Sequence, residues 1–281
     1  MNDTIALRKL QLEAFSILID FSSFCREHGL TWFLLSGSAL GAKRHDGFIP
    51  WDDDLDVGML RQDYERFLSL VDLYPSEYRV DVPGINPKLA TMFTKVCRRG
   101  THFATKETVQ AGYDQGIFID IIPLDRVAME PDVRKRQLRN SRFWQSMSYL
   151  WHSGDINVPG TGVLGSIERF GCRAIHHLVR VFVSRRTILN RYSRSILSNR
   201  DGLSDEWMLL SWPHTKPFPT DVLVPVSTHL FEGVQMPVPG KLEDYLELMY
   251  GDWDVLPPED KRHTHMPLKI VFSDGEVWTQ D

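Results

Sequence analysis

Four aspartates fall within five positions, directly after a Pro-Trp pair, at Asp52, Asp53, Asp54 and Asp56. Successive side chains of a strand point to opposite faces, so an extended segment over 52–59 would place three of these carboxylates on one face. Like charges this close repel one another strongly in a partly buried site. A fold keeps such a cluster at low cost only where a positive group neutralises it. A metal ion could be that group, and hard oxygen ligands such as carboxylates select Mg2+, Mn2+ or Ca2+.

The calcium interpretation is excluded by the spacing that follows. An EF-hand loop beginning at Asp52 needs Gly at its sixth position and Glu at its twelfth. The chain has Val57 and Asp63 at those positions. A magnesium-type site and a solvated acidic turn therefore remain as the two interpretations of the cluster.

The residues before the acids favour the first interpretation. A strand-like segment over 31–35 is followed by Gly37 and Ser38, and then by a short helix expected over 39–43. A strand, a Gly-Ser turn and a helix start form a phosphate-binding arrangement, because free backbone N–H groups and the helix dipole point at the anion. Any N-capped helix looks similar, so the signal becomes specific only in combination with the acidic segment less than twenty residues on.

Three blocks of the chain, in this order, resemble the LicD family of bacterial phosphocholine transferases. This family lies in the nucleotidyltransferase superfamily and has fukutin and fukutin-related protein as distant eukaryotic relatives. The first block runs from Leu40 to Asp56 and includes Gly-Phe-Ile-Pro-Trp-Asp-Asp-Asp; the others lie at 116–125 and 231–265. The resemblance implies an α/β (α+β) fold, with a nucleotidyltransferase-like mixed sheet flanked by helices.

The resemblance also implies a divalent-metal site built from two neighbouring strands. In the superfamily, two carboxylates on one strand and a third on the next hold one or two ions. We assign Asp54 and Asp56 as metal ligands, Asp120 as third ligand or general base, and Asp52 as an additional ligand, with Mg2+ or Mn2+ as cofactor. Asp53 points to the other face. Asp120 could instead be a turn acid near Pro123, although Asp125 fits that role better.

Further candidates bind the substrate or move protons. Gly37, Ser38 and Arg44 of the first block are expected to contact donor phosphates, although Arg44 could also be a solvated charge at a helix end. Lys95 lies on an alternating strand and, by parity, on the face opposite Arg98; an exposed sheet face is its alternative.

Trp51 and Arg262 complete the substrate-binding set, Trp51 because it adjoins the acids and an aromatic ring can hold a quaternary ammonium. His45 and His265 are the acid–base candidates, since imidazole titrates near neutrality. His45 could instead only brace its loop.

The chain divides into three predicted parts: a catalytic core over 1–130, a helical basic segment over 131–220, and a C-terminal hairpin and helix over 221–281 that complete the active site. The formal net charge is −5, yet residues 133–200 hold 13 basic and two acidic residues, so this segment carries +11 and the remainder −16. Three interpretations stay open: the basic segment lies on an anionic membrane surface, holds a polyanionic acceptor, or pairs with the acidic remainder.

These features predict a metal-dependent phosphotransferase. The donor is a CDP-alcohol, with CDP-choline favoured. The acceptor is a hydroxyl of a cell-surface glycan, lipopolysaccharide or teichoic-acid precursor, free or lipid-linked, and CMP is released. No apolar run approaches the roughly 20 residues of a membrane span, no signal peptide is apparent, and Cys25, Cys97 and Cys172 lack metal or disulfide spacing. We therefore expect a cytoplasmic protein, alone or peripheral on the inner membrane face, with no nucleic-acid partner.

Two alternatives remain from other classes. A true nucleotidyltransferase would attack the α-phosphorus of an NTP and release pyrophosphate. A non-catalytic module that binds glycans or nucleotides would use the same fold without the metal chemistry.

Overall fold

A curled mixed sheet forms the centre of the protein in a computed structural model that describes residues 1–154, 175–197, 202–212, 216–262, 264 and 266–280. Within those residues the main path of the sheet runs β1-β2-β6-β4-β3, and β7 and β8 extend it from the second half of β6. Only β2 and β6 are parallel neighbours in it; the other pairs are antiparallel. The bounds are β1 (Phe33–Leu34), β2 (Asp56–Leu60), β3 (Tyr78–Asp81), β4 (Thr94–Arg98), β6 (Phe118–Ala128), β7 (Leu203–Met208) and β8 (Phe218–Pro219).

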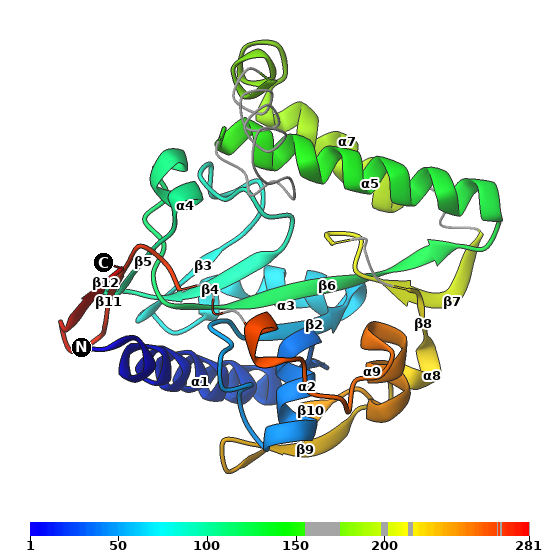
Figure 1. Ribbon diagram of the computed structural model, residues 1–281. Coiled ribbons are helices and arrows are strands. Elements are labelled where there is room, and N and C mark those ends of the chain that lie inside the picture. Colours follow the sequence, from blue (N-terminus) through cyan, green and yellow to red (C-terminus); the bar gives the residue numbers. More distant parts are fainter. Residues whose placement is uncertain (155–174, 198–201, 213–215, 263, 265, 281) are drawn as a thin grey trace.

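Helices cover both faces of this sheet (Figure 1). One side carries α1 (Asp3–Glu27) and α3 (Arg61–Ser69), which pack through Phe21 and Phe67; the 3-10 turn η1 (Val71–Leu73) follows α3. The other side carries α5 (Pro131–His152), which pairs with α7 (Arg185–Leu197). The apolar stripe of α1 at spacings of three and four is buried as its sequence period predicts, and Asn2 caps the helix through a hydrogen bond from the N–H of Ile5.

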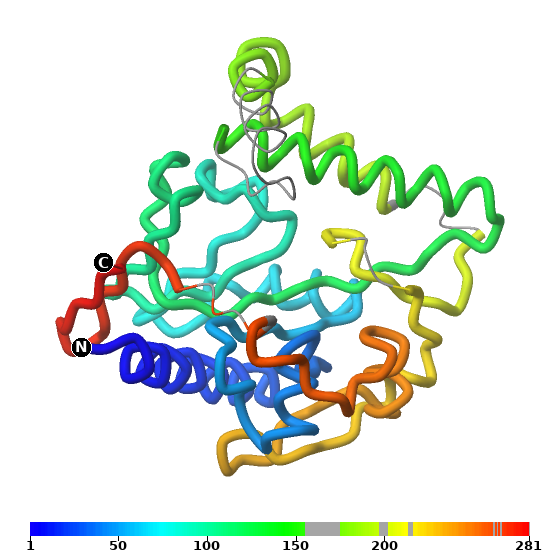
Figure 2. The backbone as a smooth tube through the Cα atoms, viewed as in Figure 1, coloured from blue at the N-terminus to red at the C-terminus, as the bar shows by residue number. Residues whose placement is uncertain are grey.

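Much of the C-terminal fifth of the chain packs against the first sixty residues. It contains α8 (Thr220–Leu223), the hairpin of β9 (Ser227–Phe231) and β10 (Val234–Val238), α9 (Leu242–Tyr250), η2 (Glu259–Lys261), β11 (Lys269–Val271) and β12 (Val277–Thr279). The last two strands form a small sheet with β5 (His102–Ala104), next to α4 (Lys106–Ala111). The two ends of the chain lie on the same side of the molecule (Figure 2), and the indole N–H of Trp278 donates to Asp3.

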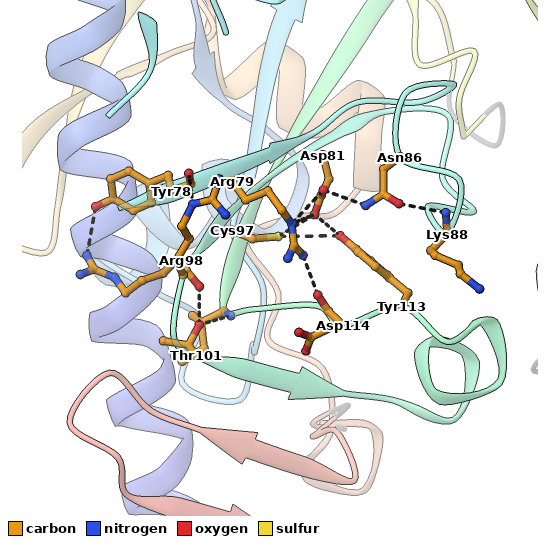
Figure 3. A network of polar contacts seen from close by, with 12 residues as sticks. Tyr78, Arg79, Asp81, Asn86, Lys88, Cys97, Arg98, Thr101, Tyr113 and Asp114 are labelled. Atoms are coloured by element: carbon orange, nitrogen blue, oxygen red, sulfur yellow. Dashed lines mark hydrogen bonds and ion pairs between the residues drawn. The ribbon is translucent and has the colours of Figure 1, made fainter. Parts of the chain in front are cut away.

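A polar network fixes the loops beyond β3 and β4 (Figure 3). The buried carboxylate of Asp81 accepts hydrogen bonds from the guanidinium of Arg79, the amide of Asn86 and, at 2.7 Å, the hydroxyl of Tyr113. A buried carboxylate costs little only when it is paired in this way. The network therefore holds Tyr113 rigidly, and the cavity described below uses that residue as a wall.

The predicted fold class is confirmed, with a mixed sheet flanked by helices, and three local predictions are wrong. The strand expected over 52–59 begins only at Asp56, because the backbone N–H of Asp52 closes a turn onto the carbonyl of Ile49. The helix expected from Ala39 begins at Ser36. Asp125 is no turn residue: it lies in β6, buried, and binds the Arg61 guanidinium at 2.7 and 2.8 Å.

The basic middle segment makes part of its contacts within the fold. Arg134 pairs with Glu206 at 2.6 Å, and Arg185 donates to the carbonyls of Asn86 and Gly84. These contacts favour the internal interpretation for those two arginines, while the membrane and acceptor interpretations stay predictions. The strand β7, inside the predicted middle part, pairs with β6 of the predicted core. Among the described residues, no helix is both long and apolar enough to cross a membrane.

Candidate active site

Two carboxylates meet where the parallel strands β2 and β6 begin. Asp56 and Asp120 are direct partners in the β2–β6 register, and neighbouring strands lie about 4.8 Å apart. On the other side of Asp120, its partner on β4 is Lys95, whose Nζ lies 2.6 Å from Asp120 Oδ1. Both members of this ion pair are 7% exposed. The strand register thus produces the pair of carboxylates that the sequence predicts, together with a buried cation.

Asp52 and Asp54 reach the same place from the turn that precedes β2. The side chain of Asp52 shares a hydrogen bond with that of Asp54, and Asp54 acts electrostatically on Asp56. A turn rather than strand alternation thus brings Asp52 and Asp54 near Asp56, and a shared metal site stays a prediction. Asp54 is exposed.

The N-terminus of α2 (Ser36–His45) lies against this cluster. Ser38 is buried, and its hydroxyl accepts a hydrogen bond of 2.9 Å from the backbone N–H of Asp56. A Cβ on Gly37 would lie 2.6 Å from Asp52 Oδ2, so the absence of a side chain there lets the carboxylate approach the helix. The first N–H groups of a helix have no acceptor within it and favour anions. Gly37 and Ser38 lie at this helix start, and a phosphate contact there stays a prediction.

Burial, and then the crowding of negative charge, shifts the pKa values of these acids upward. Desolvation, and then the neighbouring charges of Asp54 and Asp53, raises the pKa of Asp52 to about 8. Desolvation and the other carboxylates raise the pKa of Asp56 well above its usual value. Desolvation also raises the pKa of Asp120 to about 6, although the Lys95 ammonium acts in the opposite direction. The site holds more carboxylate than Lys95 neutralises.

The donor set therefore fits a hard divalent cation by its chemistry: it is all oxygen, and its repulsion calls for positive charge. Within the described part of the chain, no three Asp, Glu, His or Cys side chains are already arranged to hold a metal ion. Because Asp54 is exposed, its carboxylate is the one with room to turn toward the others. Mg2+ or Mn2+ binding stays a prediction.

Two residues that the sequence did not single out hold the loops of the site. Gln11 of α1 is buried, and its amide donates to the carbonyls of Asp52 and Ile49, which fixes the acidic turn. Ser36 has a positive φ of 47°, and its N–H donates to the buried hydroxyl of Tyr245 on α9. Tyr245 could have been found from the sequence, because it falls inside the third block of the resemblance. No sequence motif marks Gln11.

Glu232 at the tip of the β9–β10 hairpin is a third missed residue. Its carboxylate accepts from the N–H of Phe48 at 3.2 Å and pairs with Arg8, and that guanidinium lowers the pKa of Glu232. Its own N–H donates to the carbonyl of Asp46. The hairpin thus holds the loop that leads into the acids.

The remaining candidates form a second group beside the carboxylates. The Arg262 guanidinium lies 5.0 Å from the ring centre of Trp51, and the ring of His45 meets Trp51 edge-on at 6.4 Å. Arg44 donates to the carbonyl of Val255 at 3.0 Å. The structure therefore brings these four residues together but joins none of them to the carboxylates by a hydrogen bond. His265 lies outside the described residues.

The surroundings of His45 in this group favour the neutral imidazole. Desolvation, and then the charge of Arg44, lowers its pKa, and its buried Nε2 has no hydrogen-bond partner among the described residues. Trp51 is no open aromatic cage, because Arg262 covers its ring.

Replacing Gly37 with Ala should separate activity from stability. The new Cβ would displace the Asp52 carboxylate, which is the end of a movable side chain, while Ala favours a helix by about 1 kcal/mol. We expect a melting temperature equal to or above that of the wild type, and at least tenfold lower activity. Gly41→Ala is the control, because its Cβ would lie 2.5 Å from the backbone carbonyl oxygen of Gly47 and should destabilise the fold. Equal losses of stability in both variants would contradict this.

Carboxylates on parallel neighbouring strands lie beside a Gly-Ser helix start, the arrangement that the resemblance to nucleotidyltransferases predicts. Residues 29–153 match a family model described as LicD/FKTN/FKRP, nucleotidyltransferase domain. The match covers 125 of the 281 residues, less than half of the chain, and confirms the predicted resemblance to the LicD family.

The curated relatives agree with this assignment. The chain is 28% identical over 272 residues, 93% of its own length and 96% of the relative's, to the lipopolysaccharide cholinephosphotransferase LicD of Haemophilus influenzae. Shorter similarities link it to uncharacterised proteins of Rickettsia typhi, 33% identical over 63 residues, and Rickettsia prowazekii, 36% identical over 55 residues; these cover 22% and 20% of this chain and 20% and 21% of the relatives. The name of the Haemophilus influenzae relative is that of a transferase, the class of enzyme that the sequence predicts here.

Proposed function

We propose that this protein transfers a phospho-alcohol group, most simply phosphocholine, from a cytidine diphosphate donor to a hydroxyl of lipopolysaccharide or a related cell-surface glycan. The observation that carries the proposal is the direct register of Asp56 and Asp120 beside the Gly37–Ser38 helix start. The name of the Haemophilus influenzae relative, which the chain matches over almost its whole length, supports phosphocholine and lipopolysaccharide as substrates. The working location we propose is the cytoplasm or the inner face of the membrane, where a lipid-linked acceptor precursor would lie.

In the proposed reaction the acceptor oxygen forms a bond to the β-phosphorus of the donor. The bond from that phosphorus to the oxygen bridging the two phosphates breaks, and CMP leaves with the bridging oxygen. Gly37, Ser38 and Lys95 offer N–H groups and an ammonium to the donor phosphates. Asp52, Asp54 and Asp56 would hold a divalent cation, which when bound supplies charge neutralisation at the phosphates. Asp120 either completes that set or accepts the proton of the acceptor hydroxyl, as its pKa of about 6 allows.

The second candidate is a nucleotidyltransferase that acts on an NTP. The description of the matching family model as a nucleotidyltransferase domain favours it. The two reactions differ in the phosphorus attacked, so the product separates them: CMP in one case and pyrophosphate in the other.

A donor panel tests the proposal. The protein is incubated with Mg2+ or Mn2+, purified lipopolysaccharide, and in turn CDP-choline, CDP-ethanolamine, CDP-glycerol, CDP-ribitol or each NTP. We expect metal-dependent CMP release from one CDP-alcohol, with the alcohol phosphate found on the acceptor, and none from the double variant Asp54→Asn/Asp56→Asn. Pyrophosphate release from an NTP would support the second candidate. Nucleotide binding without any product in the presence of acceptor would favour a binding module.

A further inference from the structure

A cavity of about 560 Å³ lies between α5, α4 and the sheet, next to the carboxylate cluster. It is bounded by α5 on one side and by residues of β4, β5 and β6 on the other. Lys95 lines it and at the same time binds Asp120, so the cavity and the candidate active site share this residue. A cavity of this size, adjoining reactive carboxylates, is large enough for a small organic ligand.

One polar group in the cavity wall lacks a partner. Gln145 of α5 lines the cavity and is 4% exposed, and its Nε2 makes no hydrogen bond to any described residue. Leaving a buried donor unpaired costs about 1–3 kcal/mol, so a purely structural role would be better served by leucine. A ligand atom that accepts a hydrogen bond would satisfy this amide.

The other walls favour a flat and largely apolar group. Phe103, Phe118, Tyr113 and Tyr149 contribute aromatic rings. Tyr113 is held by the Asp81 network of Figure 3, so this wall is formed before any ligand arrives. Desolvation, and then the charge of Asp120, raises the pKa of Tyr149, which places its hydroxyl in the field of the catalytic carboxylates.

The charged side chains of the walls favour a ligand that carries phosphates. Lys88, Lys95 and Arg142 line the cavity together with the acid Glu107, and Asp120 pairs with Lys95. These basic groups would attract a nucleoside that carries phosphates.

We propose that this cavity binds the pyrimidine nucleoside of the donor, with Gln145 Nε2 donating to the 2-carbonyl oxygen of the base and the phosphates directed toward Lys95 and the carboxylates. This inference rests on the proposed function, because it needs a nucleotide donor. In this proposal Gln145 recognises the base, while Asp56 and Asp120 act in the transfer reaction.

Equilibrium binding with two probes tests it. CMP carries the base and ribose 5-phosphate lacks it; each is titrated by calorimetry with Mg2+ present into the wild type, Gln145→Leu and Gln62→Leu, the last an exposed position on α3. We expect Gln145→Leu to weaken CMP binding about 5- to 20-fold, the loss of one buried hydrogen bond, with ribose 5-phosphate unaffected. Its melting temperature should equal or exceed that of the wild type. Gln62→Leu should change neither CMP binding nor the melting temperature.

A second variant keeps the test independent of any rearrangement around position 145. Ser146→Trp, from an exposed position in the cavity wall, fills the cavity and should abolish CMP binding without unfolding the protein. Unchanged CMP affinity in both variants, with binding still lost in Asp56→Asn, would overturn the cavity assignment and leave the proposed function standing. Absence of CMP binding to the wild type would overturn both.

Discussion

Asp56→Asn is expected to lower CMP release by about 10³-fold or more, in line with the loss of a central electrostatic group. Asn keeps the shape of the side chain but removes the charge at the point where β2 meets β6. The measurement is the initial rate of CMP release from the donor identified in the panel, at saturating Mg2+. Asp72→Asn, at an exposed position in η1, is the control and should keep full activity.

The same variant should be more stable than the wild type in metal-free buffer. The pKa of Asp56 is raised in the fold, so the ionised carboxylate is disfavoured there, and wild-type stability falls as pH rises above the ordinary pKa of the group. Asn should therefore raise the melting temperature by about 2–4 °C, the change expected for 1 kcal/mol, near pH 7.5, and the gain should shrink toward pH 4. A variant that loses activity and stability together would identify Asp56 as structural.

Lys95→Met is expected to cost about 3–5 kcal/mol of unfolding free energy, because it leaves the Asp120 carboxylate without its partner where both side chains are buried. Urea denaturation at neutral pH measures this. Activity should also fall below detection, since the donor phosphates lose their cation and Asp120 becomes harder to ionise.

The double variant Lys95→Met/Asp120→Asn separates these two effects. Removing both charges should restore most of the stability, because no unpaired ion remains, but it should restore no activity. Lys135→Met, at an exposed position on α5, is the control for the loss of a lysine. A Lys95→Met variant within 1 kcal/mol of the wild type would show that the pair contributes little to the fold.

The sequence predicted which residues come together better than the local structure that brings them together. The D-x-D spacing and the third acid led to Asp56 and Asp120, and strand parity placed Lys95 opposite Arg98, whose guanidinium indeed reaches Ser16 on the α1 side. Strand alternation failed for Asp52 and Asp54, because a turn closed at Ile49 and fixed from α1 by Gln11 overrides the extended pattern. The strand alternation of a segment carries no information about a contact with a residue about forty positions away in the sequence.

The cavity could not be predicted from the sequence for the same reason. Its walls come from strands, helices and loops between Lys88 and Trp212, and Gln145 stands out only once its surroundings show that its amide nitrogen has no partner among the described residues. Trp51 was predicted to bind substrate, and only the fold brings Arg262, more than two hundred residues later, onto its ring. Packing between segments far apart in the sequence determines these contacts, and the composition carries no information about that packing.

The contacts from the C-terminal fifth also set an order of assembly. Tyr245 reaches Ser36 across 209 positions, Glu232 reaches Phe48 across 184, and Arg44 reaches Val255 across 211. Contacts this distant in sequence form late, since the loop they close must first be brought together. During synthesis on the ribosome the acids therefore emerge long before their loops are locked. The candidate active site becomes complete only when the last fifth of the chain has been made, so any activity of this site is among the last properties that the growing protein acquires.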